Sequence, residues 1–198
     1  MIKVFLRTGS FIVLGAAGIL PGRLAVSDSN MDVAPSRMLW IESPNYGARP
    51  TDRDIDTVVI HSTAGSTLYG TVKWFETPRS QVSAHFTIGK DGTIIQHVST
   101  YDRAWHAGES VDALDRSNVN HHSVGIELVN LNNGRDPYPK RQLESLKHVL
   151  YMLSRRHPLV LITSHENIAR PKGRKSDPAG FPWEELDEFA GLGIKIVP

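Results

Sequence analysis

The sequence predicts a single α/β domain in which helices flank a mixed central β-sheet. Short runs of β-branched residues indicate buried strands, an Asp-Gly turn between two such runs indicates an antiparallel pair, and one long segment carries leucines at helical spacing. A length of 198 residues, of which 40% are hydrophobic, is enough for one core. These patterns do not fix the order of the strands in the sheet.

The first packed segment is a strand followed by a short helix. The run Thr57–Ile60 is β-branched and ends at His61, so this histidine is expected at the end of a buried strand. Ser66 or Thr67 can cap the helix that follows, and Pro78 ends it. The apolar face of this helix carries Leu68, Val72 and Phe75.

The middle of the chain predicts three more strands. Residues 83–88 and 93–98 are joined by a turn that contains Asp91-Gly92, which favours an antiparallel hairpin. After a loop rich in His and Asp over residues 105–122, the run Val124–Val129 reads as another strand. Glu127 alternates with its apolar neighbours there, so its carboxylate is expected to project from the opposite face of the sheet.

The last third of the chain predicts the longest helix and a final strand. Pro139 opens the helix and Pro158 follows its end, with leucines at positions 143, 146, 150 and 153 on one face. The run Leu159–Thr163 then predicts a buried strand that leads to His165. A loop continues to Asp177, and residues 183–189 predict one or two further helical turns.

The N-terminus has the layout of a secretory signal. Lys3 and Arg7 precede an apolar run over residues 11–20, and small residues at 25–27 offer a cleavage site. We therefore expect a signal peptide over 1–27, a linker over 28–39 and the domain over 40–198, with export to the periplasm or the extracellular space. A buried N-terminal helix or an uncleaved anchor is the alternative, and Arg23 weakens the cleavage site.

Composition excludes several classes of function. A formal net charge of +1 without a Lys/Arg block argues against nucleic-acid binding. The absence of cysteine rules out disulfides, thiolate metal sites and a lipidated cysteine, so no lipid anchor is expected. No stable membrane insertion is expected after signal cleavage. We expect a monomer, and any metal must be held by His and carboxylate.

Two histidines and one aspartate form the candidate metal site. His61 and His165 each follow a short buried strand, and neighbouring strands that end together deliver such residues to one rim of a sheet. Asp177 lies twelve positions after His165 in a loop bracketed by Gly and Pro, and it can return to the same rim. Two nitrogens and one oxygen suit Zn²⁺ with a fourth position open to water. The alternatives are hydrogen-bonded or surface histidines and an Asp-Pro turn.

Seven segments in order resemble one known family. They are Ser43–Pro50, Val59–Ala64, Val82–Phe86, Ala104–Gly108, Val124–Leu128, Ser164-His165 and Gly173–Pro178. Together they resemble the type 2 N-acetylmuramoyl-L-alanine amidases, a zinc fold shared with peptidoglycan recognition proteins, and the similarity is strongest to the bacterial branch. The resemblance implies hydrolysis of the amide bond between N-acetylmuramic acid and L-alanine in peptidoglycan or muropeptides, in a groove at the strand ends.

The resemblance also implies roles for individual residues. His61, His165 and Asp177 match the family's zinc ligands. Glu127 matches the catalytic acid that moves a proton from water to the leaving amine, and Lys175 matches the lysine that stabilises the oxyanion. Read alone, Glu127 is a solvated strand residue or ion-pair partner, and Lys175 is one of several surface lysines.

Further residues of the resemblance are expected around the substrate. Trp105, His106 and Asn45 are predicted to bind it, and His85 is predicted to support the site from behind. A core Trp with a capping His and a hydrogen-bonded core His85 are the alternatives. For the whole chain, a non-catalytic peptidoglycan-binding module and a structural zinc domain are the competing hypotheses, and the latter requires a fourth ligand.

Overall fold

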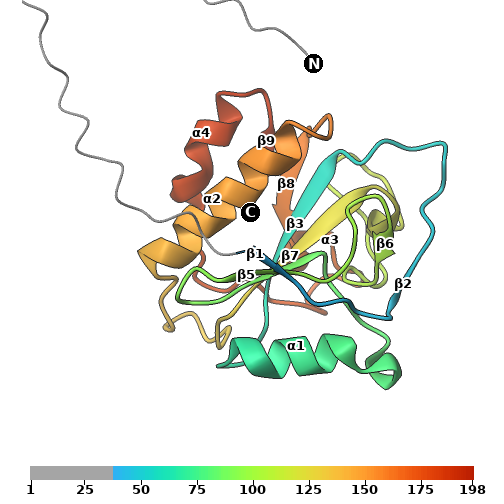
Figure 1. Cartoon of the computed structure of the whole chain (residues 1–198). Helices are drawn as coiled ribbons and strands as arrows, with labels where there is room; N and C mark the ends of the chain where they lie inside the picture. The colour runs from blue at the N-terminus through green and yellow to red at the C-terminus, as the bar shows by residue number, and fades with distance from the viewer. Residues whose placement is uncertain (1–37) are drawn as a thin grey trace, which may run out of the picture. The chain divides into compact units, whose positions relative to one another are not determined.

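The structure is a computed structural model that describes residues 38–198 (Figure 1). The strands are β1 (Met38–Trp40), β2 (Tyr46–Gly47), β3 (Thr57–Ser62), β4 (Phe86–Ile88), β5 (Ile94–Gln96), β6 (Arg103–Ala104), β7 (Ser123–Leu128), β8 (Leu161–Ser164) and β9 (Lys195–Val197). The α-helices are α1 (Leu68–Glu76), α2 (Lys140–Ser154), α3 (His165–Ile168) and α4 (Asp187–Ala190). Short 3₁₀ turns are η1 (Pro78–Ser80), η2 (Val119–His121) and η3 (Trp183–Leu186).

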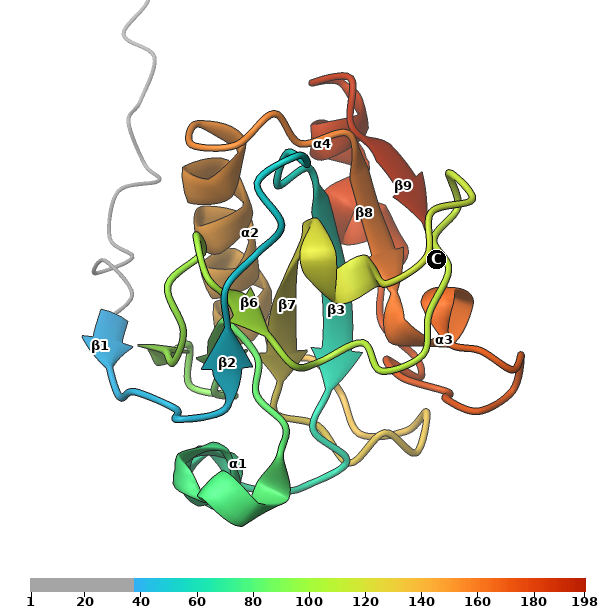
Figure 2. The same ribbon diagram turned by 90° about the vertical axis from the view of Figure 1, so that its right-hand side faces the viewer.

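A seven-stranded mixed sheet forms the centre, in the order β1-β5-β4-β7-β3-β8-β9. The β4–β5 hairpin is its antiparallel pair, as the Asp-Gly turn predicts, and the other neighbours pair in parallel. The parallel strands β7, β3 and β8 therefore end at one edge, which lies above α1 in Figure 2. A separate two-stranded ladder joins β2 to β6.

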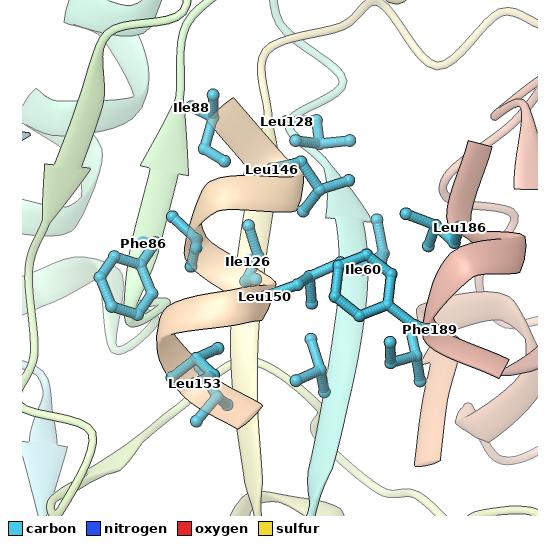
Figure 3. Packing of buried hydrophobic residues seen from close by; sticks show 14 of the residues in the cluster. Ile60, Phe86, Ile88, Ile126, Leu128, Leu146, Leu150, Leu153, Leu186 and Phe189 are labelled. Atoms are coloured by element: carbon cyan, nitrogen blue, oxygen red, sulfur yellow. The ribbon is translucent and has the colours of Figure 1, made fainter. Parts of the chain in front are cut away.

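The two faces of the central strands differ in chemistry. One face of β3 and β7 carries Val58, Ile60, Val124, Ile126 and Leu128, all fully buried. These side chains pack against α2 and α4 in one apolar cluster with Leu146, Leu150, Leu153, Leu186 and Phe189 (Figure 3). The opposite face carries buried polar residues instead, among them Thr57, His61, Thr87, Ser123 and Thr163. The apolar face supplies most of the stabilisation, because burying apolar area is the dominant favourable term in folding.

The predicted helices form for the expected reasons. Thr67 caps α1, its hydroxyl accepting a hydrogen bond from the Gly70 N–H, and Val72 and Phe75 are the buried residues of that helix. Pro139 stands directly before α2, which buries its leucine face on the sheet. Within residues 38–198, no helix is both long enough and apolar enough to cross a membrane.

Several elements differ from the prediction. The linker expected over 28–39 overlaps β1, because Met38–Trp40 pairs in parallel with β5, a partner more than fifty residues away in the chain. The edge strand β9 and the short helix α3 were likewise not expected from local pattern. The predicted signal peptide over 1–27 lies outside the described residues.

Candidate metal centre and active-site groove

The sheet brings His61 and Glu127 side by side. β3 and β7 are parallel, and their register pairs His61 with Glu127, so both side chains project from the polar face. β8 ends at Ser164, whose hydroxyl caps α3 by accepting from the Asn167 N–H. His165 is the first residue of α3 and is therefore delivered to the same strand-end edge.

Asp177 returns to this edge through a backbone contact. The Glu166 N–H donates to the Asp177 carbonyl at 2.9 Å, which fastens the loop against the start of α3. The Asp177 Oδ2 atom then lies 3.1 Å from His165 Nδ1 and 3.4 Å from His61 Nδ1. The three residues are buried, and their ligand atoms lie within 4.8 Å of one another. The structure thus brings together the three residues that the sequence predicts as ligands.

Hydrogen bonding shows that this cluster suits a cation. His165 Nδ1 faces Asp177 Oδ2 at 3.1 Å, and its Nε2 lies 3.3 Å from the Ala107 carbonyl, so the ring has an acceptor for an Nε2–H when a metal ion occupies Nδ1. Burial, followed by the neighbouring charge of His165, lowers the pKa of His61 to about 4, so this ring is neutral near pH 7. Two imidazole nitrogens and a carboxylate oxygen therefore converge on one point, which is a set of ligands that Zn²⁺ takes in proteins.

His106 contacts the candidate ligand His61. Its Nδ1 lies 3.0 Å from His61 Nε2, and its Nε2 lies 3.1 Å from the Ser123 hydroxyl. The ring also lines the groove, as predicted, together with Trp105. His106 is therefore both a groove residue and a direct partner of a candidate ligand. The sequence did not predict its contact with His61.

Glu127 places a buried carboxyl oxygen beside the three candidate ligands. Its Oε2 atom is buried and has no hydrogen-bond partner in the described part of the chain. Burial, followed by the negative charge of Asp177, raises its pKa to about 8, while the charge of Lys175 acts in the opposite direction. Such a carboxyl group is suited to accept and release a proton near neutral pH.

Lys175 lies at the exposed side of the same site. It lines the groove, and among residues 38–198 its ammonium has no ion-pair partner. The adjacent Arg174 is held differently, because its guanidinium donates to the carbonyls of Arg170, Ala107 and Glu109. Arg174 thus fixes the loop, and Lys175 remains available to a bound molecule.

A groove of about 510 Å³ runs past these groups. One wall is α1 and its N-terminal approach, which contribute Thr67, Thr71 and Trp74. The remaining lining residues include Trp105, His106, Glu127, His165, Lys175 and Asp177. The Trp74 side chain is 57% exposed, so an aromatic face is available to a ligand at that end.

Two predicted site residues lie away from the three candidate ligands. Asn45 lies outside the groove, contrary to the prediction, because its amide donates to the Phe75, Thr77 and Val82 carbonyls and is only 2% exposed. His85 is fully buried behind the site, with its ring 5.8 Å from that of His106, centroid to centroid. It accepts from the Gly125 N–H and so supports β7, without contacting the three candidate ligands through a hydrogen bond.

Comparison with known proteins identifies the family. Residues 51–180 match the family model described as N-acetylmuramoyl-L-alanine amidase. The chain belongs to this family. A relative, the 1,6-anhydro-N-acetylmuramyl-L-alanine amidase AmpD of Salmonella typhimurium (strain SL1344), is 33% identical over 174 residues, which cover 77% of this chain and 89% of the relative. The AmpD amidase of Haemophilus influenzae is 32% identical, and the match covers 73% of this chain and 87% of that relative.

Solved structures agree with this assignment. A crystal structure of a selenomethionine AmpD derivative has a TM-score of 0.66 and 30% identity, and covers 79% of this chain and 94% of its own. The Escherichia coli amidase AmiD, in complex with anhydro-N-acetylmuramic acid-L-Ala-D-γ-Glu-L-Lys, has a TM-score of 0.61 and 28% identity. The match covers 74% of this chain and 59% of AmiD. The predicted mixed α/β fold and the predicted amidase activity on the bond between N-acetylmuramic acid and L-alanine are therefore confirmed.

The same relatives contradict the predicted export. The AmpD amidases that match most of this chain are cytoplasmic enzymes of cell-wall recycling, so the prediction of a periplasmic or extracellular protein was wrong. The prediction rested on ten apolar residues after two cations, which is a short and unspecific pattern.

Sequence reasoning missed the residues that hold this amidase's loops together. Asn132 is the main example, because its Oδ1 atom accepts from the Ser62 hydroxyl and from the Ala179 N–H, both at 2.7 Å. Its Nδ2 donates to the Ser176 hydroxyl at 3.2 Å. Asn132 therefore ties the end of β3 to the loop that carries Lys175 and Asp177. No local sequence signal marks this role, since the partners lie far apart in the chain.

Proposed function

We propose that His61, His165 and Asp177 bind Zn²⁺ and that this amidase hydrolyses 1,6-anhydro-muropeptides at the bond between N-acetylmuramic acid and L-alanine. The observation that carries the proposal is the convergence of two imidazole nitrogens and the Asp177 carboxylate beside Glu127, whose Oε2 atom has no hydrogen-bond partner within residues 38–198. Three protein ligands leave room for a reacting group, as in catalytic zinc sites. Relatives named for the 1,6-anhydro substrate support this substrate class.

The protein's own groups divide the chemistry between them. Bound Zn²⁺ supplies Lewis-acid chemistry, because it polarises a carbonyl and favours ionisation of water near neutral pH. Glu127 accepts a proton as the oxygen of water bonds to the carbonyl carbon. The Lys175 ammonium stabilises the negative charge that develops on the carbonyl oxygen. Glu127 then passes its proton to the amide nitrogen of L-alanine as the C–N bond breaks.

The groove suits an amphipathic fragment of the cell wall. Trp74 and Trp105 offer aromatic faces on which a sugar ring or a peptide can pack. Lys175 and Glu127 line the same groove, so a scissile carbonyl bound there can contact both groups. Thr67, which caps α1, and Thr71 within α1 also line the groove. A muropeptide can therefore find both apolar and polar contacts along this groove.

Mass spectrometry of a digested substrate tests the proposal. The purified chain is incubated with an anhydro-muropeptide and, in parallel, with the same muropeptide carrying a reduced muramic acid. We expect free stem peptide beginning at L-alanine, formed faster from the anhydro substrate. Chelation should abolish the product and added Zn²⁺ should restore it, whereas Glu127→Gln should lower the rate by about 10²- to 10⁴-fold.

The matched control is Glu184→Gln, which removes an exposed carboxylate that does not line the groove. This variant should keep the wild-type rate. Full activity of Glu127→Gln would contradict its catalytic role. Full activity after complete removal of the metal would contradict the zinc site, and equal rates on both substrates would contradict the anhydro preference.

A further inference from the structure

A chain of hydrogen bonds connects the candidate ligand His61 to the η2 turn. The Ser123 hydroxyl donates to the Val119 carbonyl at 2.6 Å. Since a backbone carbonyl can only accept, the Ser123 oxygen must act as the acceptor toward His106 Nε2, at 3.1 Å. The His106 proton is then on Nε2, and its Nδ1 accepts from the His61 Nε2–H at 3.0 Å. The direction of every bond is therefore set by one backbone carbonyl.

The consequence at His61 is a defined tautomer. With its proton on Nε2, the neutral ring presents the Nδ1 lone pair to Asp177 and His165. Ligating histidines commonly donate their second N–H to a carboxylate, a carbonyl or water. Here a second imidazole takes that place, and the two rings meet edge to face, with centroids 5.1 Å apart.

The surrounding backbone is shaped around His106. A Cβ atom at Gly125 would lie only 2.5 Å from the His106 Cγ atom, so the bare glycine of β7 makes room for the ring. The Asn120 side chain in η2 accepts from the N–H groups of His106 and Ala107, at 3.2 and 2.9 Å. The η2 turn thus holds both the backbone of His106 and, through Val119 and Ser123, its ring nitrogen.

We propose that His106 and Ser123 are positioning residues that fix the tautomer and orientation of His61 and thereby set the affinity for the metal. The proposal rests on the zinc site proposed above. If Ser123 is replaced by Ala, the His106 Nε2–H loses its acceptor and the ring is free to place its proton on Nδ1. His61 must then accept at Nε2 and carry its own proton on Nδ1, where the metal binds.

The test combines zinc affinity with the tautomer of His61. Zn²⁺ affinity is measured by competition with a chromophoric chelator for the wild type, Ser123→Ala, His106→Leu and His106→Asn. We expect affinity to fall by about 10- to 100-fold in Ser123→Ala and His106→Leu. His106→Asn should recover part of the loss, because the amide oxygen can accept where Nδ1 does. In the metal-free proteins, ¹⁵N NMR of the imidazoles should show His61 protonated on Nε2 in the wild type and on Nδ1 in Ser123→Ala.

The matched control is Ser43→Ala. Ser43 is also fully buried and its hydroxyl also donates to a backbone carbonyl at 2.6 Å, that of Phe75, but this hydroxyl accepts from the Asn45 N–H and not from a histidine ring. It should lose comparable stability in thermal unfolding while keeping wild-type zinc affinity. Wild-type affinity and an unchanged His61 tautomer in Ser123→Ala would overturn the inference. Failure of the wild type itself to bind Zn²⁺ would instead overturn the proposed function.

Discussion

Asn45 offers a direct test of whether the structure or the family pattern describes its role correctly. Its amide group carries two protons, and these are shared among the Phe75, Thr77 and Val82 carbonyls and the Ser80 hydroxyl, at 2.9 to 3.3 Å. Asn45→Ala removes both donors from a site where the side chain is 2% exposed. We therefore expect a loss of stability without a loss of substrate binding.

The magnitude follows from the number of bonds. Each hydrogen bond contributes about 1 kcal/mol net, so two give about 2 kcal/mol. For a domain of about 160 residues, with an unfolding entropy of about 2.1 cal/mol/K per residue, this lowers Tm by about 6 °C. Thermal unfolding followed by circular dichroism measures the shift, and KM is determined well below both transitions.

Asn45→Asp is the informative companion variant. It keeps the size of the side chain but turns carboxylate oxygens toward carbonyl oxygens, so it should be less stable than Asn45→Ala. An increase in KM for Asn45→Ala, with Tm unchanged, would refute the reasoning and return Asn45 to the substrate.

Three further outcomes are expected. Leu150→Ala opens the apolar cluster at a fully buried position and should cost about 2–5 kcal/mol in urea unfolding, with kcat of the folded enzyme unchanged; a cost near zero would contradict the packing. Burial lowers the pKa of His97 from 6.5 to about 4, so between these pH values the unfolded chain binds the extra proton and stability falls as pH falls. His97→Gln should reduce that slope by up to about 1.4 kcal/mol per pH unit, and an unchanged slope would count against a neutral buried ring. Lys175→Met should lower kcat by about 10²- to 10³-fold with little change in KM, and an effect confined to KM would assign the ammonium to ground-state binding.

Local pattern predicted the elements that have strong periodicity. The strand that ends at His61, the strand with Glu127 and the leucine-rich helix each bury a continuous apolar face, which sequence shows directly. β1 and β9 are short edge strands whose pairing depends on partners elsewhere in the chain, so no local signal marks them. The strand order also depends on pairing between distant segments, so it could not be predicted from local pattern.

Part of the candidate site was likewise predictable from local pattern, and part was not. The three candidate ligands were predicted because two of them follow buried strands and the third lies in a loop bracketed by Gly and Pro. The contact between His61 and His106 and the hydrogen bonds of Asn132 join residues that are far apart in the chain, so no local pattern predicts them. Asn45 was misplaced because the resemblance matched its segment, whereas its surroundings are set by the carbonyl groups at the end of α1.

The opposite chemistry of the two sheet faces couples the strand register to the proposed catalytic site. A shift of β7 by one residue against β3 would turn Glu127 toward α2 and place Ile126 beside His61, because side chains alternate along a strand. Such a misfolded sheet would have a carboxylate in the apolar cluster and an incomplete proton-transfer site. Refolded protein that regains amidase activity has therefore also regained the native register of β7 against β3, so the activity assay reports on folding fidelity.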